Sequence, residues 1–386
     1  MALIQMVKSA GAATFEEMAG KYFDIITRVL SQNNCSCLDL VFDQYRAMSI
    51  KAAERQERGE SLSMEIKIHN QNTPVPKQWN KFMSNPKNKQ NLATFLCESL
   101  RTILKTQLHP RQNVFIAGGF KDGRETVSCI RGNSSSVSSL FSDQDEADTR
   151  LLLHAKHASN TRQRGVVQSP DTAVAVLCVA HFQNIGCREL WFQTGLKDKV
   201  RFIPIHSFIT ILPWSFALES LASIACMDRM RYNKCFFRYY CQKIAKTDDA
   251  RHFLFCRKNK TSDNLPPKSD SLSHHIKRAN FQTYIWKTAL CPMQNLPSPD
   301  GLGWKLEDDV LLPVLMTKNS APEGIAELTT CGCEKSKCLR NCSCKSSNLP
   351  CTEACACMAD HESCSNPVND VVDSSVLKSE NDDPDI

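Results

Sequence analysis

Nine cysteines lie between Cys331 and Cys364, and their spacing constrains this region more than any other feature of the sequence. A triplet, in which two cysteines separated by one residue precede a third, repeats three times. The segment contains few large aliphatic residues, so hydrophobic burial alone is too weak to fold it. The triplets are Cys331, Cys333 and Cys338, then Cys342, Cys344 and Cys351, then Cys355, Cys357 and Cys364.

We predict that metal ions supply the missing folding energy of this segment. Zinc takes four tetrahedral ligands and binds thiolates well, and structural zinc sites often fold the segment that holds them. Nine thiolates complete three four-sulfur sites if three of them bridge, so that each ion has two terminal and two shared ligands. The alternatives are reduced cysteines without metal and a disulfide knot, and the odd number of cysteines disfavours the knot.

Charge and hydropathy limit where the chain can reside and what it can bind. The longest uncharged apolar stretch, residues 202–218, is interrupted by two prolines, so we expect no membrane span and no membrane partner. The N-terminus lacks the basic residue of a secretory signal, which predicts an intracellular protein. The last twenty residues carry a net charge of −5, which leaves +11 on the preceding 366 residues of a chain whose total is +6. The folded part is therefore basic enough to face a phosphate backbone.

Three segments place acidic residues where an α/β fold positions ligands. Residues 38–43 predict a strand that ends at Asp43, and residues 143–157 predict a helix with acids in its first turn. Residues 165–181 predict two strands around a turn at 169–172, whereas the polar stretch 131–139 predicts a loop. The acids at these places are Asp43, Glu146, Asp148 and Asp171.

Grouped carboxylates have a chemical use, because hydrolysis of a phosphodiester by two metals needs several of them to hold Mg²⁺ or Mn²⁺. The alternative is structural, since acids at the start of a helix stabilise it through capping and the helix dipole. The residues alone leave both interpretations open.

The order and spacing of these segments resemble the PIN/flap-endonuclease superfamily. Asp43 ends a strand, EADTRLLLHA begins a helix at Glu146, and VVQSPDTAVAVL carries Asp171. The resemblance implies a mainly parallel central sheet and assigns metal binding to Asp43, Glu146, Asp148 and Asp171. The family pattern has a further acid where this sequence has Ala173, which implies a weakened or inactive nuclease site. A group of mobile-element-derived animal proteins that join such a domain to a cysteine-rich tail is more similar still.

The cysteine triplets resemble the tesmin-type CXC domain, in which nine cysteines hold three zinc ions. This resemblance implies a nuclear protein that binds DNA or chromatin, and RNA is a further candidate ligand.

These observations divide the chain into four parts. We predict a PIN-like α/β domain over residues 1–220, a helical extension over 221–325 that includes a helix near 270–286, a zinc module over 331–366, and a disordered acidic tail over 367–386. For the function, three alternatives stay open. They are a nucleic-acid-associated zinc protein with a degenerate nuclease-like domain, an active Mg²⁺- or Mn²⁺-dependent nuclease, and a structural zinc protein that binds other proteins.

Overall fold

The structure of the protein is a computed structural model in which two compact units are distinguished. One unit comprises residues 1–226 and 277–313, and the other comprises residues 227–276 and 314–386, so we describe each by itself. The described residues are 11–32, 35–45, 49–50, 64–195, 199–208, 267–307, 310–318, 331–333, 338–339, 342–346, 349, 351, 355–357 and 364–367. All of residues 209–266, and the acidic tail after residue 367, therefore lie outside the described part.

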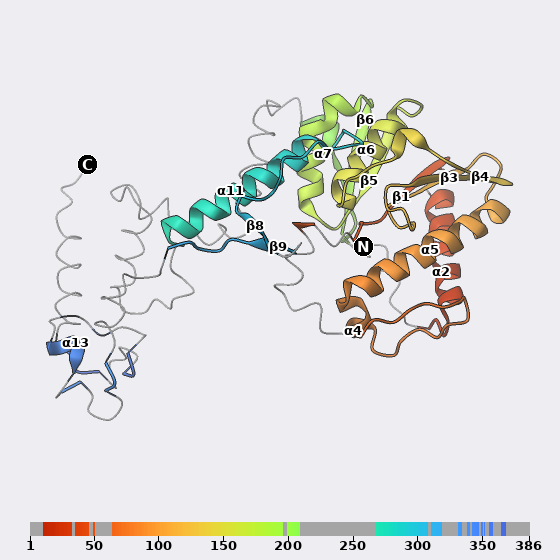
Figure 1. Cartoon of the computed structure of the whole chain (residues 1–386). Helices are drawn as coiled ribbons and strands as arrows, with labels where there is room; N and C mark the ends of the chain where they lie inside the picture. Colours follow the sequence, from red (N-terminus) through yellow and green to blue (C-terminus); the bar gives the residue numbers. More distant parts are fainter. Residues whose placement is uncertain are drawn as a thin grey trace. The chain divides into compact units, whose positions relative to one another are not determined.

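A four-stranded sheet with the order β1-β2-β3-β4 opens the first unit (Figure 1). The first two strands are parallel and pair Leu40 with Ile116, and the other two pairs are antiparallel. Between β3 and β4 the turn is only two residues long, and Gly132 has a φ of 85°, which suits a tight hairpin. The strands are β1 (Cys37–Val41), β2 (Asn113–Ala117), β3 (Thr126–Ile130) and β4 (Asn133–Ser136), followed by the short 3₁₀ helix η1 (Ser138–Leu140).

The polar stretch that predicts a loop is thus partly a strand. β4 reads Asn-Ser-Ser-Ser and lies at the edge of its sheet with mostly exposed side chains, so it needs no apolar residues. Pairing with β3 holds it in place, and this pairing is not visible in the hydropathy of the segment.

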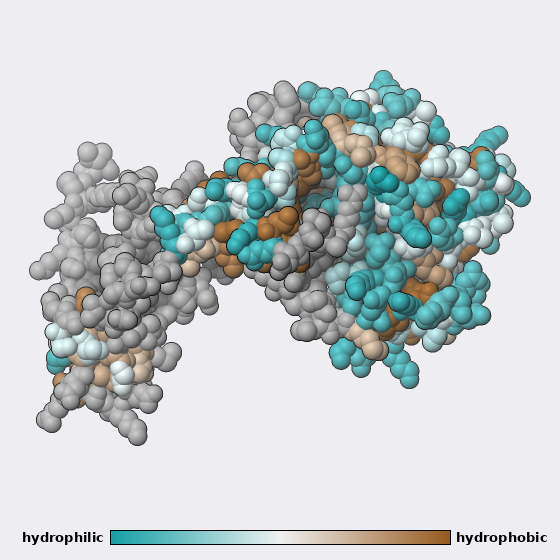
Figure 2. Space-filling model, viewed as in Figure 1, coloured by the Kyte–Doolittle hydropathy of each residue, from teal (hydrophilic) through white to brown (hydrophobic). Residues whose placement is uncertain are grey.

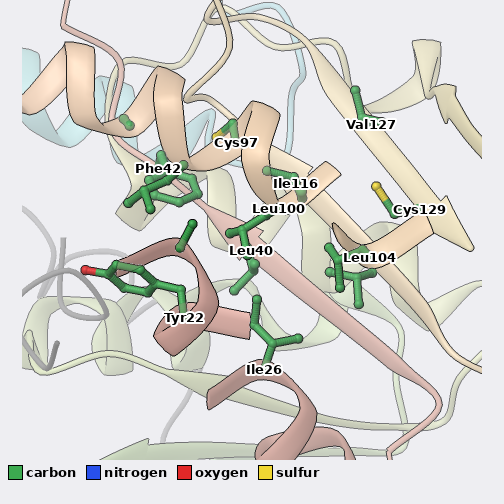
Figure 3. Close-up of a cluster of buried hydrophobic side chains, with 14 of the residues drawn as sticks. Tyr22, Ile26, Leu40, Phe42, Cys97, Leu100, Leu104, Ile116, Val127 and Cys129 are labelled. Atoms are coloured by element: carbon green, nitrogen blue, oxygen red, sulfur yellow. The ribbon is translucent and has the colours of Figure 1, made fainter. Parts of the chain in front are cut away.

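Three helices, α2 (Phe15–Gln32), α4 (Trp79–Ser84) and α5 (Pro86–Gln107), belong to this sheet's core. Asn85 caps α5 by accepting a hydrogen bond from the Lys87 amide at 2.8 Å, and Pro86 occupies the first helical position. Figure 3 shows side chains of α2 and α5 gathered around Leu40 and Ile116 of the two parallel strands.

A second sheet, with the order β5-β6-β7, follows the helix that begins after Glu146. The pair β5–β6 is parallel and the pair β6–β7 is antiparallel. Its core is buried against α6, α7 and the later helix α11. The elements are α6 (Ala147–Ser159), β5 (Arg164–Gln168), α7 (Thr172–Ile185), β6 (Glu189–Thr194), β7 (Arg201–Pro204) and α8 (Ile205–Phe208).

The prediction of a second strand after the turn at 169–172 is wrong, because that segment is the helix α7. Its sequence is apolar on every side, so periodicity could not distinguish a helix from a buried strand. Its ends carry the distinguishing signals, since Asp171 is the N-cap and Gly186 ends the helix in the left-handed region at a φ of 83°. The helix at 143–157 is confirmed, and on it Ala147 is buried, while Leu151, Ala155 and Ala158 are half-buried.

The predicted helix near 270–286 is confirmed as α11 (Ser269–Lys287). Its residues Ala279, Thr283 and Trp286 are buried, whereas Ile276 is exposed. A hairpin of β8 (Trp304–Glu307) and β9 (Val310–Pro313) follows it.

The chain is a mixed α/β protein with a separate cysteine cluster, as predicted at that level. Among the described strands, however, four of six pairings are antiparallel, so a mainly parallel sheet is not observed there. The tight turn at Gly132 is one local cause, because strands joined by two residues can only pair antiparallel.

On the visible face of the first unit hydrophilic residues predominate, and hydrophobic residues form small separate patches (Figure 2). Within the described ranges, no helix combines the length with the hydropathy that a membrane crossing requires.

Candidate metal centre

All nine cysteines of the triplets are buried and together form one cluster. These nine cysteines are not disulfide-bonded, because the sulfur atoms of neighbouring cysteines lie 3.6 to 3.9 Å apart, well beyond the ~2.05 Å of a disulfide bond. For Zn–S bonds of about 2.3 Å, tetrahedral geometry places two sulfurs on the same ion about 3.8 Å apart. The spacing of the sulfurs is therefore that of a zinc–thiolate cluster.

Three sets of four thiols converge in this cluster, with all sulfurs of a set within 4.8 Å of one another. Cys331 belongs to all three sets, and Cys338 and Cys351 each belong to two. A cluster of three zinc ions requires such sharing. Nine thiolates can give each ion four ligands only if some thiolates bind two ions at once. The sets are Cys331, Cys338, Cys351 and Cys357; Cys331, Cys333, Cys338 and Cys342; and Cys331, Cys344, Cys351 and Cys355.

Backbone hydrogen bonds hold the cysteine triplets in place, one within the second triplet and one between the first and the third. The helix α13 (Ser343–Ser346) carries Cys344, and the Leu349 amide donates to the Cys344 carbonyl at 2.9 Å. The Ala356 amide, between the first two cysteines of the third triplet, donates to the Cys331 carbonyl at 2.8 Å. The first and third triplets are therefore joined by backbone as well as by sulfur contacts.

Burial sets the protonation of several thiols in the metal-free cluster. It raises the pKa of Cys344 to about 11, and it raises the pKa values of Cys331, Cys338 and Cys351 further. Burial opposes ionisation of Cys342 as well, but hydrogen bonds from the Lys345 amide and from neighbouring thiols lower its pKa to about 7. Zinc binding would displace the protons from the raised thiols, because a coordinating thiol is deprotonated.

Asn366 is part of the centre, and the spacing of the cysteines does not reveal it. Its side chain is 2% exposed and donates to the Leu349 carbonyl at 2.8 Å and to the Cys351 sulfur at 3.4 Å. A donor on a thiolate sulfur positions a metal ligand and offsets its charge. Its position two residues after Cys364 is the one sequence signal that marks it.

The predicted carboxylates occupy a different part of the chain, in the first unit. The Ala147 amide, at the start of α6, donates to Asp43 Oδ1 at 2.9 Å. Glu146 is the N-cap residue of α6, and its Oε2 accepts from Gln282 Nε2 at 3.4 Å, while Asp148 lies in the first turn. The structure thus brings Asp43 to the helix start that carries Glu146 and Asp148.

Asp171 serves α7 instead. Its Oδ1 accepts from the Ala173 amide at 2.8 Å, and its own amide donates to Ser169 Oγ at 3.1 Å. The side chain is exposed, and Ala173 stands at the position where the PIN pattern has an acid. Asp171 and the Ala173 amide therefore have the geometry of a helix N-cap.

Among the described residues, the ligand atoms that converge within 4.8 Å in threes or fours are all cysteine sulfurs. The four acids belong to none of these groups, and the Mg²⁺ or Mn²⁺ site stays a prediction. Zinc, by contrast, fits the donor set of the cysteine cluster.

A buried arginine fixes the start of α6 and was not predicted. Arg150 is fully buried, and its Nη1 donates to the Gly123 carbonyl at 2.7 Å. Its Nη2 donates to the carbonyls of Arg124 and Glu125 at 2.7 and 3.1 Å. These bonds hold the loop between β2 and β3 against the helix that bears Glu146 and Asp148.

No protein-family model, curated protein or solved structure matches this chain.

Proposed function

We propose that this chain is a nucleic-acid-associated zinc protein. Its nine cysteines hold three zinc ions and present a CXC-like module to duplex DNA, and its α/β body keeps a nuclease-like arrangement of acids without cleaving. The burial of all nine thiols, eight of which converge in three overlapping sets of four, carries the proposal.

Charge supports the nucleic-acid part of the proposal. The 366 residues before the acidic tail carry a net charge of +11, which favours a polyanionic ligand. Binding that neutralises phosphates releases counterions, so the affinity for DNA should fall steeply as salt rises.

The hydrogen bonds of the acids support an inactive body. Asp43 and Asp171 each accept from the first turns of a helix, and Ala173 supplies a methyl group where the PIN pattern has a ligand. Removing one carboxylate from a two-metal site lowers the charge that holds the cations and disturbs their positions.

The experiment compares DNA binding and cleavage by the zinc-loaded full chain. We expect salt-dependent binding of duplex DNA and no cleavage with Mn²⁺, and we expect weak cleavage from the Ala173→Asp variant. This variant should fold, because an acid in the first turn of a helix interacts favourably with its dipole. Cleavage by the wild-type chain that Asp171→Ala abolishes would show an active nuclease. Absence of DNA binding at every salt concentration would favour a zinc protein that binds other proteins.

A further inference from the structure

The sheet β5-β6-β7 has one buried face and one open face. Val167, Leu190 and Phe192 point to the buried side and join the core with residues of α6, α7 and α11. Side chains alternate along a strand, so their neighbours point to the opposite side. Strand pairing then fixes which residues lie side by side there. They are Val166 and Gln168 of β5, Trp191 and Gln193 of β6, and Phe202 and Pro204 of β7.

This open face exposes apolar and aromatic surface. Val166 is 53% exposed and Phe202 is 52% exposed, and Trp191 between them is half-buried. A contiguous exposed patch of apolar and aromatic side chains on a folded domain commonly marks a binding site.

The aromatic ring at the centre of the face is held in position. The His206 ring contacts Trp191 edge to face with 5.1 Å between centroids, and His206 Nδ1 lies 3.0 Å from the Leu190 carbonyl. Trp191 Nε1 donates to Glu189 at 3.5 Å. A ring fixed from two sides loses little conformational entropy when a flat partner stacks on it.

Basic residues border the face at both ends of its strands. Arg162, Arg164 and Arg188 lie at the beginning of β5 and β6, and all three are exposed. Lys199 and Arg201 lie at the opposite end, because β7 runs antiparallel to β6. The acid of the face, Glu189, is paired with Arg164 at 2.8 Å. The surroundings are therefore positive, which complements a phosphate backbone.

Gln168 and Gln193 add groups that can read a base. They are register partners on neighbouring strands, in the row that ends at Phe202. Primary amides offer both donors and acceptors, so they match the edges of unpaired bases.

We propose that this face binds single-stranded nucleic acid, with bases stacked on Trp191 and Phe202 and the phosphates along the flanking arginines and lysines. A duplex keeps its bases stacked on one another, whereas a single strand can splay them onto aromatic side chains. The face is separate from the cysteine cluster, so it extends the proposed function to a second site with a different ligand.

The test measures fluorescence anisotropy of labelled oligo(dT), oligo(rU) and a DNA duplex with the zinc-loaded full chain. Stacking on an aromatic residue contributes enough affinity that Phe202→Ala should weaken single-strand binding about tenfold, and Phe202→Tyr should retain it. Phe202→Leu keeps an apolar side chain but removes the π-face, so it should behave like the alanine variant. Tyr284→Ala is the matched control, because Tyr284 is a 43% exposed aromatic residue on α11.

The outcomes separate this proposal from the function of the zinc module. Loss of single-strand binding in Phe202→Ala, with duplex binding unchanged, supports the face as a distinct site. Full single-strand affinity in Phe202→Ala and Phe202→Leu overturns it, as does a wild-type chain that binds the duplex alone. If sedimentation shows that wild-type chains associate through this face and Phe202→Ala separates them, the occupant is a second copy and the proposal fails. Absence of duplex binding with single-strand binding retained contradicts the proposed role of the zinc module instead.

Discussion

The cysteine cluster and the acids of the α/β body are both groups of metal-ligand side chains, yet they differ in what holds them. Eight of the nine buried thiols lie in sets that share members, and few apolar residues lie between them. Asp43 and Asp171 each accept a backbone hydrogen bond at the start of a helix, in a body with an extensive apolar core. The comparison teaches that side chains which fold around a metal must converge, whereas acids that accept hydrogen bonds at helix starts keep their positions without a metal.

Zinc removal should produce the largest difference in folding between the cysteine cluster and the α/β body. Structural zinc sites contribute about 10–16 kcal/mol to folding, so a strong chelator should unfold the cysteine module and leave the α/β body folded. Amide NMR spectra before and after chelation would check this, because the signals of the two regions should respond separately. Loss of dispersed signals from α2 and α5 would contradict the independence of the body.

Sharing within the cluster predicts unequal effects of single substitutions. Cys331→Ser should reduce zinc content more than Cys333→Ser, because Cys331 belongs to three sets of thiols and Cys333 to one. Metal analysis of the purified variants measures this difference. Cys291→Ser is the control, since Cys291 is an exposed thiol outside the cluster and its loss should leave zinc content unchanged. Equal losses in the two cluster variants would argue against bridging by Cys331.

Acid should release the zinc. The pKa of Cys344 is raised to about 11 and that of Cys342 is lowered to about 7 in the metal-free cluster. Below pH 7 both thiols are protonated, so protons compete with zinc for the sulfurs. The affinity for zinc should therefore rise with pH until the pH exceeds the pKa of each metal-free thiol. Calorimetry in buffers of different ionisation enthalpy should detect release of about nine protons per three zinc ions near pH 6. Release of about four or fewer would mean that many of the thiols are not ligands.

Arg150→Met should destabilise the body and leave the zinc module unchanged. The substitution removes the guanidinium donor from the partly buried carbonyls of Gly123, Arg124 and Glu125, and only the last two keep a backbone donor. It should cost about 2 kcal/mol of unfolding free energy. Urea unfolding monitored by circular dichroism would measure the change. Arg131→Met, at an exposed arginine, should remain within about 0.5 kcal/mol of wild type. A drop in zinc content with Arg150→Met would show that the two regions are coupled.

Replacement of Asp43 should have the smallest effect and distinguishes a cap from a catalytic ligand. Asp43→Ala removes the acceptor for the Ala147 amide and should cost about 1 kcal/mol, whereas Asp43→Asn keeps an acceptor and should cost less. Thermal unfolding gives both values. If the wild-type chain proves to cleave DNA and Asp43→Asn loses that activity while staying stable, the acid is a metal ligand.

The cysteine cluster could be predicted from sequence because the spacing of its cysteines is local and repetitive. Asn366 could not, because its contact with Cys351 depends on how the chain returns to the cluster. In the same way, the pairing of Asp43 with the start of α6 joins residues 104 positions apart, and no local pattern reports such a contact.

Errors in the predicted fold have local causes as well. The apolar sequence of α7 fits a helix or a buried strand, and an acid at its start, Asp171, is equally typical of a metal ligand and of a helix cap. The serine-rich β4 has no apolar pattern, since it lies at an exposed edge and depends on β3 for its structure. The predictions from sequence are correct where a local pattern is unambiguous. They are wrong where that pattern fits two structures, as in α7, or where pairing across the chain decides, as in β4.

Native mass spectrometry of the full chain, purified without chelator, tests the central claim most directly. The account predicts three zinc ions per chain that are lost together on acidification, and protection of all nine cluster cysteines from alkylation while the ions are bound. One or two zinc ions, or disulfide bonds between residues of the triplets, would contradict a three-zinc thiolate cluster.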